Sequence, residues 1–296
     1  MRPATALRPA GLTLALLLLT ACAEGSGSRD GGDAGAEPPP VPEVVALPEA
    51  EDALVLQVEQ TGGFVTPEML AGRLPIVSVY GDGRVITEGP VIAIYPAPAW
   101  PNVQVQQADR ATVQELAQRA LAAGVDETAD LGSPPLADAP STRFTLVTED
   151  GPVTREVYAL QEGVGAGGLT EEQEAARAEL RELMDELTGL STTLDTDAAP
   201  APYQPAAVAA LARPWSPPAD EVSQPELTWP GPALPGEPIA PGVTCVTATG
   251  EQATTLADAA QGATALTPWV GEDGTRWSIT FRPLLPDESG CADLTG

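Results

Sequence analysis

The chain has 296 residues and a formal net charge of −28 at pH 7, because 42 acidic residues outnumber 14 basic residues that are all arginine. Nucleic acids require a cationic surface and are excluded as partners, and anionic lipid headgroups are disfavoured for the same reason. The absence of histidine and lysine excludes His-dependent nucleophiles, the usual zinc sites, lysine-based phosphate binding and Schiff-base chemistry, so only carboxylate-based acid–base catalysis remains open.

Residues 1–21 have the pattern of a signal peptide. Arg2 and Arg8 form a positively charged start, and residues 11–21 are almost entirely apolar. That run is far shorter than the ~20 residues that a membrane-spanning helix needs. It ends in Leu19-Thr20-Ala21-Cys22, which resembles the bacterial lipobox, where small residues precede the cysteine whose thiol carries the lipid. We expect Cys22 to anchor the mature chain to the outer face of the cytoplasmic membrane; the alternative is a secretory signal with an incidental cysteine.

Residues 22–49 are expected to act as a tether. Their first part is rich in Gly, Ser and Asp, and residues 37–42 read Glu-Pro-Pro-Pro-Val-Pro. Such sequences give a flexible spacer followed by a semi-rigid extended one. The tether would hold the folded part of the chain away from the membrane.

Residues 50–192 are predicted to form an α+β domain. The pattern predicts, in order, a strand, a helical turn, a hairpin, a helix, a second hairpin and a second helix. These elements are expected over residues 53–59, from Thr66, and over 75–90, 110–123, 142–159 and 171–190. Runs of strands and helices in this order favour an antiparallel sheet with helices on one face.

Local signals mark the ends of these elements. Asp109 is a predicted helix cap, and Thr170 with Gln173 forms a predicted capping box. The hairpins are expected to turn at the Asp-Gly pairs 82–83 and 150–151, with both residues of each pair at positive φ.

Residues 203–296, which follow a predicted linker at 193–202, differ in kind. Residues 214–241 are rich in proline and are predicted to form an extended wrapping segment. A strand is predicted at 243–247, a short helix at 255–266 and a third hairpin at 271–282 around Asp273-Gly274, with Trp277, Ile279 and Phe281 on one face. The region is therefore expected to be a smaller α+β unit rich in proline and tryptophan.

Cys245 and Cys291 are predicted to form a disulfide. They are the two cysteines that remain once Cys22 carries a lipid, and an even pair in an extracytoplasmic compartment is more often a bridge than two free thiols. A metal or redox pair is the weaker alternative. Closing a loop of this length stabilises the fold by about 4 kcal/mol in the chain-entropy model.

Three further groups of residues are candidates for sites. Glu171, Glu172 and Glu174 fit either a cation or acid–base site or, more simply, favourable charge at a helix N-terminus. The three Asp-Gly pairs lack the spacing of a calcium loop, so turn chemistry explains them. The tryptophans fit either sugar stacking or buried anchors for the proline-rich segment, and they are Trp100, Trp215, Trp229, Trp269 and Trp277. No catalytic, cofactor or metal residue is predicted.

Several stretches resemble known sequences. Residues 80–86 and 137–142 resemble a small domain of uncharacterised bacterial lipoproteins, and residues 229–231 and 281–288 are similar to hypothetical actinobacterial lipoproteins. The resemblance implies the same localisation and fold, and it carries no catalytic residue across. The bias toward Ala, Gly, Pro and Arg is also typical of a high-GC genome, as in actinobacteria.

The sequence thus favours a non-enzymatic lipoprotein of the cell envelope that binds, scaffolds or senses an envelope protein or glycan. The alternative is an extracytoplasmic hydrolase that acts on envelope glycans through a pair of carboxylates. A protease inhibitor ranks third, because the first domain has no cysteine to staple an inhibitory loop.

Overall fold

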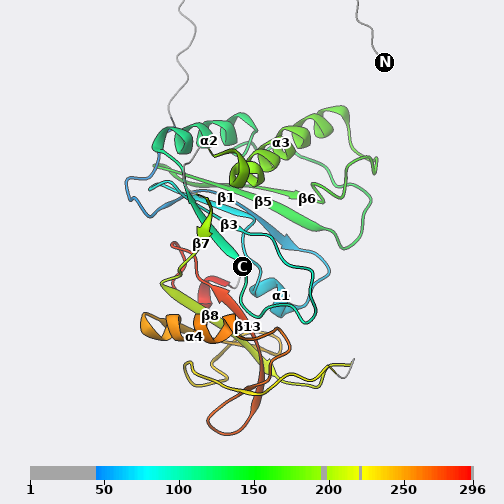
Figure 1. The fold of residues 1–296 in the computed structure, drawn as a ribbon. Coiled ribbons are helices and arrows are strands. Elements are labelled where there is room, and N and C mark those ends of the chain that lie inside the picture. Colours follow the sequence, from blue (N-terminus) through cyan, green and yellow to red (C-terminus); the bar gives the residue numbers. More distant parts are fainter. Residues whose placement is uncertain (1–44, 195–198, 220–221, 295–296) are drawn as a thin grey trace, which may run out of the picture. The chain divides into compact units, whose positions relative to one another are not determined.

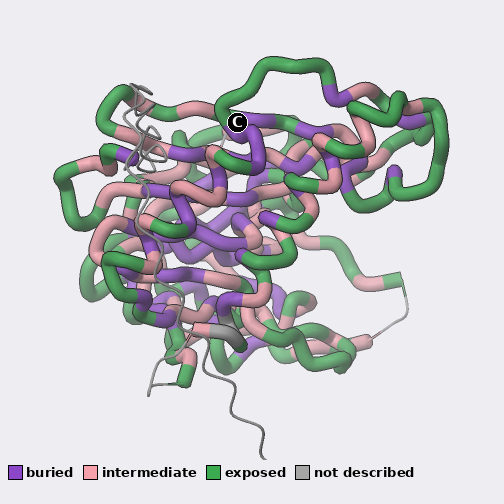
Figure 2. The backbone as a smooth tube through the Cα atoms, turned by 90° about the horizontal axis from the view of Figure 1, so that it is seen from above, coloured by how far each residue is buried: buried purple, intermediate pink, exposed green. Residues whose placement is uncertain are grey.

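Two β-sheets organise the computed structural model, which describes residues 45–194, 199–219 and 222–294 (Figure 1). The predicted signal peptide, Cys22 and the predicted tether up to residue 44 lie outside the described residues. Both sheets belong to one compact unit, Glu43–Gly296. Buried backbone runs through the middle of this unit, and exposed residues concentrate in the loops around it (Figure 2).

The first sheet has seven strands in the order β6-β5-β1-β2-β3-β4-β7, and each neighbouring pair is antiparallel. Its strands are β1 (Leu54–Gly62), β2 (Val77–Tyr80), β3 (Arg84–Glu88), β4 (Val103–Gln107), β5 (Pro140–Thr148), β6 (Gly151–Tyr158) and β7 (Ala201–Pro202). The short helix α1 (Pro67–Ala71) lies between β1 and β2 in the chain, with Thr66 as its cap.

One face of this sheet is covered by α2 (Arg110–Ala122) and α3 (Glu171–Thr193), as Figure 1 shows. Both helices have an apolar stripe at helical spacing, which buries Leu116 of α2 and Leu183 and Leu187 of α3 against the sheet. Burying each of these side chains contributes about 1.5–3 kcal/mol. The Asp109 cap and the Thr170–Gln173 capping box form as predicted.

The second sheet has six strands in the order β10-β11-β8-β13-β12-β9. They are β8 (Ala207–Pro214), β9 (Leu227–Thr228), β10 (Glu237–Ala240), β11 (Val243–Thr249), β12 (Trp269–Val270) and β13 (Arg276–Pro283). The pair β9–β12 is parallel and the others are antiparallel. The helix α4 (Glu251–Gln261) packs Leu256 and Ala260 into a core with Trp269 and Phe281.

The predicted disulfide between Cys245 and Cys291 is confirmed. It joins β11 to the 3₁₀ helix η1 (Cys291–Leu294), with the two Cα atoms 5.9 Å apart. The predicted α+β class is confirmed as well, with an antiparallel sheet that carries its two long helices on one face. No helix in the described part of the chain combines the length and the apolar character that crossing a bilayer would need.

The outer face of the first sheet contacts Tyr203, which follows β7, and the segment that follows β13. Tyr80, Ile86 and Val103 form a buried cluster with Tyr203 and Leu285. The Tyr80 hydroxyl donates to Asp287 at 2.6 Å, and the Tyr203 hydroxyl donates to the carbonyl of Leu284 at 2.9 Å. The first sheet therefore shares a buried cluster and hydrogen bonds with the segment that directly follows β13.

The structure corrects the predicted turns. At each Asp-Gly pair only the glycine has a positive φ: +88° at Gly83, +112° at Gly151 and +79° at Gly274. Asp82 and Asp273 instead accept hydrogen bonds from the backbone N–H two residues later. This side-chain bond stabilises the turn without a left-handed aspartate.

Other boundaries differ from the prediction. The helix predicted at 255–266 is α4, which begins at Glu251 after Gly250 and ends at Gln261 before Gly262. The predicted linker 193–202 ends in β7, which pairs with β4. The division into separately folding domains at this linker stays a prediction.

Candidate functional site

Two cavities flank α1. We call the first the sheet cleft; it has a volume of about 550 Å³ and lies between β1, α1, β10 and the segment 282–294. We call the second the loop groove; it has a volume of about 810 Å³ and lies between α1, the loop 89–102 and β13. Arg73 and Leu74, which follow α1, line both.

The position of α1 is fixed by close contact with the second sheet. A Cβ atom at Gly72 would lie 3.0 Å from Cγ2 of Thr280 and 3.3 Å from Cδ1 of Leu211, so the chain approaches the sheet where only glycine fits without displacement. Glu68 accepts a hydrogen bond from the Thr280 hydroxyl at 2.6 Å and pairs with Arg213 at 2.5 Å. These contacts hold the shared wall of the two cavities in place.

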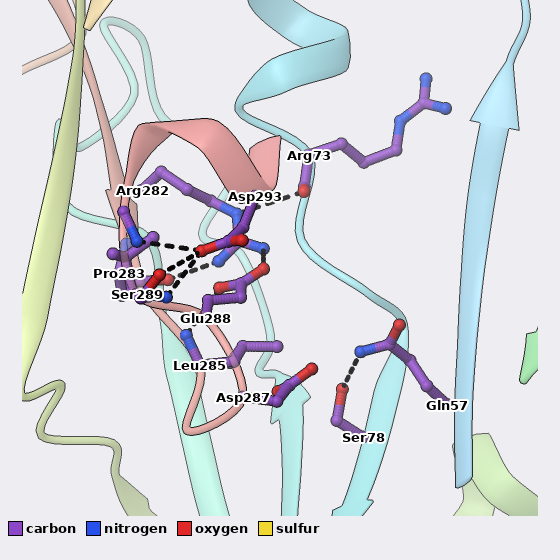
Figure 3. Close-up of polar contacts among 12 residues, drawn as sticks. Gln57, Arg73, Ser78, Arg282, Pro283, Leu285, Asp287, Glu288, Ser289 and Asp293 are labelled. Carbon is purple, nitrogen blue, oxygen red and sulfur yellow. Dashed lines mark hydrogen bonds and ion pairs between the residues drawn. The ribbon is translucent and has the colours of Figure 1, made fainter. Parts of the chain in front are cut away.

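One wall of the sheet cleft is built around Arg282 (Figure 3). Its side chain is almost fully buried and pairs with Glu288 at 2.6 Å, while its Nε donates to the carbonyl of Arg73 at 3.3 Å. A further bond runs from Arg282 to the carbonyl of Pro283. The other oxygen of Glu288 accepts from the backbone N–H of Leu285 at 2.7 Å. The pair thus ties the C-terminal segment to β13 and to the chain after α1.

Electrostatics at Glu288 reflect two opposed effects. Burial raises the pKa of this carboxyl above its ordinary value, and the nearby Arg282 guanidinium acts in the opposite direction. The Glu288 carboxylate is therefore part of an ion pair in a largely dry environment, with both oxygens engaged.

The other two acids of this segment also have structural partners. Asp287 accepts from the Tyr80 hydroxyl, and burial together with Asp287 raises the pKa of Tyr80, so this phenol stays a donor. Asp293 accepts from the backbone N–H groups of Ser289 and Gly290 and from the Ser289 hydroxyl, and these bonds lower the pKa of Asp293. All three acids hold the cleft wall together.

The floor and rim of the sheet cleft are polar. Arg73 donates to the carbonyls of Gln60 and Gly62 at 3.1 and 3.2 Å. Arg143 pairs with Glu59 at 3.2 Å and with Glu156 at 3.1 Å. Leu70 and Leu294 add apolar surface, and the described residues that line the cleft include no aromatic side chain. The cleft offers charges of both signs beside small apolar patches.

The candidate residues of the sequence lie elsewhere. Glu171, Glu172 and Glu174 occupy the first turn of α3, where negative charge is favourable, and none of them lines the sheet cleft or the loop groove. The described residues contain no cluster of three or more acidic or cysteine side chains that could hold a metal ion. The Glu cluster therefore has a structural explanation.

The tryptophans mostly pack. Trp229 and Trp269 are buried, with ring centroids 5.8 Å apart and edge-to-face, and both contact Phe281. Trp100 and Trp277 pack against the same core, and the Arg276 guanidinium lies over the ring of Trp215. The two buried rings have no face available to stack on a sugar.

Two features of the site were not predicted from the sequence. The first is the Arg282–Glu288 wall, although residues 281–288 resemble a stretch of hypothetical actinobacterial lipoproteins. The second is the exposed loop 89–102, whose signal in the sequence is the uncharged stretch that contains Val91-Ile92-Ala93-Ile94-Tyr95.

Comparison with protein-family models and with curated proteins finds no match to this chain. Function must therefore be argued from the site and from the features of the sequence.

Proposed function

We propose that this chain is a lipid-anchored, extracytoplasmic binding protein of the cell envelope, with Cys22 as its anchor and the sheet cleft as its binding site. The ligand we propose is an exposed segment of another envelope protein. The lipobox and the disulfide support an extracytoplasmic location, since such bridges persist in oxidising compartments.

The observation that supports a binding function is that the acidic side chains around the cleft hold its wall together and are not free for catalysis. Glu288, Asp287 and Asp293 each hold the cleft wall through the bonds described above. What the cleft presents is a rim with charges of both signs, from Arg143 and Glu59, beside the apolar Leu70. A peptide with mixed side chains would complement such a rim, whereas sugar recognition usually adds an aromatic platform.

The alternative is a carboxylate-dependent hydrolase of envelope glycans. It would require a protonated acid and a second carboxylate across the scissile bond. Glu288 has a raised pKa, but its ion pair with Arg282 opposes protonation at the moment of catalysis. Turnover of envelope glycans by the purified protein, abolished in Glu288→Gln with the fold intact, would replace our proposal by this one.

The anchor is tested by Cys22→Ser. We expect the wild-type protein to fractionate with membranes and to carry diacylglycerol on its N-terminal cysteine by intact mass. The Ser variant should appear in the soluble fraction. A Ser variant that stays with the membrane, together with a wild-type mass without lipid, would contradict the anchor.

The binding site is tested by a photo-crosslinking amino acid placed at Leu70, which is 44% exposed and lines the sheet cleft. The matched control is Leu136, which is 36% exposed and outside the cleft. We expect a discrete protein adduct in intact cells from position 70 only, and its loss when Arg143→Glu reverses the rim charge. Equal adducts at both positions, or none at position 70, would argue against the cleft.

A further inference from the structure

Residues 89–102, between β3 and β4, form a loop without a single charged side chain, in a chain where 19% of the residues are charged. Its tip exposes four large apolar side chains: Val91 is 67% exposed, Ile92 59%, Ile94 56% and Tyr95 66%. Consecutive exposed apolar residues of this kind mark a surface that contacts another apolar phase.

The base of the loop is fixed. Gly89 donates to the carbonyl of Asn102 at 2.6 Å, and the Asn102 amide donates to the carbonyl of Pro90 at 2.9 Å. Backbone bonds join Ala99 to Ala263 and Ala265 to Ala97, next to α4. The loop is thus held at both ends, and its apolar tip is presented to solvent instead of folding into a core.

The exposed surface extends onto α1. Met69 is 58% exposed and lines the loop groove together with Val91 and Ile92. Of the acids that line this groove, Glu68 is paired with Arg213 at 2.5 Å, and the exposed Glu88 lies outside the loop, at the end of β3. The tip itself has no charged side chain, so burying it in an apolar phase would not remove water from a charge.

We infer that the tip of the loop 89–102 inserts into the lipid–water interface of the membrane that anchors the chain. This inference rests on the proposed lipid anchor. Aliphatic side chains beside a tyrosine suit the interface, where the ring stays amphipathic and the aliphatic groups reach the acyl chains. A protein partner would instead be expected to use a polar rim, and the loop offers no charged group for one.

The length of the chain before the structure permits this contact. Residues 22–44 can span at most about 80 Å in any conformation, whereas a unit of the length of Glu43–Gly296 has a radius of gyration of about 18 Å. The tether is therefore long enough for the loop to reach the bilayer, wherever on the surface of the unit the tether begins. Tethering also raises the effective concentration of the loop at the surface, so weak insertion is enough to orient the protein.

The charge of the chain specifies the lipid. Without the signal peptide the 42 acids face 12 arginines, a formal charge of 12 − 42 = −30. An anionic bilayer would repel such a chain, so insertion is expected into neutral, zwitterionic lipid and to weaken as anionic lipid is added.

The test uses the lipidated protein in phosphatidylcholine vesicles, with an environment-sensitive fluorophore on Ile94→Cys. The matched control carries the fluorophore on Val164→Cys, because Val164 is 59% exposed and lies outside the loop. We expect a blue shift and quenching by brominated lipid at position 94 and neither at position 164. Adding Ile92→Asp should abolish both signals at position 94.

The outcomes separate the two proposals. Intact mass that shows no lipid overturns the anchor, whatever the probe reports. Lipidated protein whose probe at 94 stays in water, or responds as the probe at 164 does, overturns insertion and leaves the anchor standing. A crosslink from position 94 to an envelope protein, with the probe still in water, would assign the loop to a protein partner instead.

A second measurement needs no anchor. The full mature chain with Cys22→Ser, although released from cell membranes on fractionation, should partition weakly onto a large excess of phosphatidylcholine vesicles. Ile92→Asp with Ile94→Asp should lower this partition on the order of tenfold or more, because two buried aliphatic groups are lost. Val164→Asp should leave the partition unchanged. Equal partition of all three proteins would contradict insertion.

Discussion

Arg282 and Glu288 show how much of the site depends on single residues. In a chain with a large excess of acid, this arginine is buried to 2% exposure and its partner to 13%, and their bonds reach β13, the chain after α1 and the C-terminal segment. Removing one member of a buried pair leaves the other charge without compensation, whereas removing both avoids that cost.

We therefore expect Arg282→Leu to lower the free energy of unfolding by about 3–5 kcal/mol, and Arg282→Leu with Glu288→Leu to cost clearly less. Urea denaturation of Arg282→Leu and of the double variant measures this. The control is the exposed pair Arg276–Glu226, with side chains 51% and 49% exposed, where Arg276→Leu should cost about 0–1 kcal/mol. Equal losses of unfolding free energy at the two arginines would show that the buried pair stabilises the fold no more than the exposed pair does.

The two tyrosines at the junction of the sheets give a pH dependence with a definite sign. Burial raises the pKa of Tyr203 to about 12 and that of Tyr80 further above its ordinary value of 10.0. In the unfolded chain both phenols ionise near 10.0. Their contribution to stability is thus fully present below pH 10.0 and is lost as pH rises beyond it.

We expect the free energy of unfolding to fall steeply from pH 10.0 to about 12, with tyrosinate absorbance that appears together with the loss of tertiary circular dichroism. Tyr80→Phe should flatten this pH dependence and lower stability at neutral pH, because Asp287 loses its donor. An alkaline profile that Tyr80→Phe leaves unchanged would assign the pH dependence to other groups.

At the scale of elements, the sequence predicts what local periodicity encodes. The helices α2 and α3 and the hairpin β5–β6 carry amphipathic spacing, caps and turn residues, and all three form. The strand β8 was missed because its Ala-Val-Ala-Ala-Leu-Ala core does not alternate, and in the structure both of its faces are buried. A continuous apolar run of that kind does not distinguish a strand from a helix.

The candidate site was beyond sequence reasoning for a different reason. Tyr80 and Asp287 are 207 residues apart, and Glu68 and Thr280 are 212 apart, yet both pairs are hydrogen-bonded. Local patterns carry no information on which distant residues meet. The apolar tip of the loop 89–102 was visible in the sequence, but only the structure shows that its side chains are exposed.

The capping box of α3 allows a test of a local prediction. Thr170→Ala should lower the free energy of unfolding by about 1 kcal/mol, since the side chain of Thr170 accepts from the backbone of Gln173. Thr188→Ala in the same helix is the control, because the exposed Thr188 hydroxyl only donates to carbonyls within its own helix. Equal losses in thermal or urea unfolding would argue against a special role for the cap.

For the whole molecule, the main question is whether the two sheets fold independently. The domain division predicted from the sequence places residues 50–192 and 203–296 in separate domains. The structure adds the shared cluster of Tyr80, Tyr203 and Leu285 and the bonds to Asp287 and Leu284. Separating the sheets would expose this cluster to water, so each sheet is expected to depend on the other.

Reduction of the disulfide tests that dependence. Opening Cys245–Cys291 should remove about 4 kcal/mol in the chain-entropy model. Because Cys291 closes the segment that carries Asp287 and Glu288, we expect calorimetry of the reduced protein, or of Cys291→Ala, to show one transition at a lower temperature. Two transitions, with only one of them shifted, would support two independent domains instead.

If the chain is exported as proposed, the place of β13 in the second sheet sets an order of events during that export. This strand lies between β8 and β12, although it is the last strand of the chain. A chain exported from its N-terminus would therefore have an incomplete second sheet outside the cell until almost all of it had crossed the membrane. In the proposed export, Cys245 would cross 46 residues ahead of Cys291, and in that interval the one other cysteine outside would be Cys22. A lipid on Cys22 would block that thiol. The anchor would thus also prevent Cys245 from forming a disulfide with Cys22 before Cys291 is available.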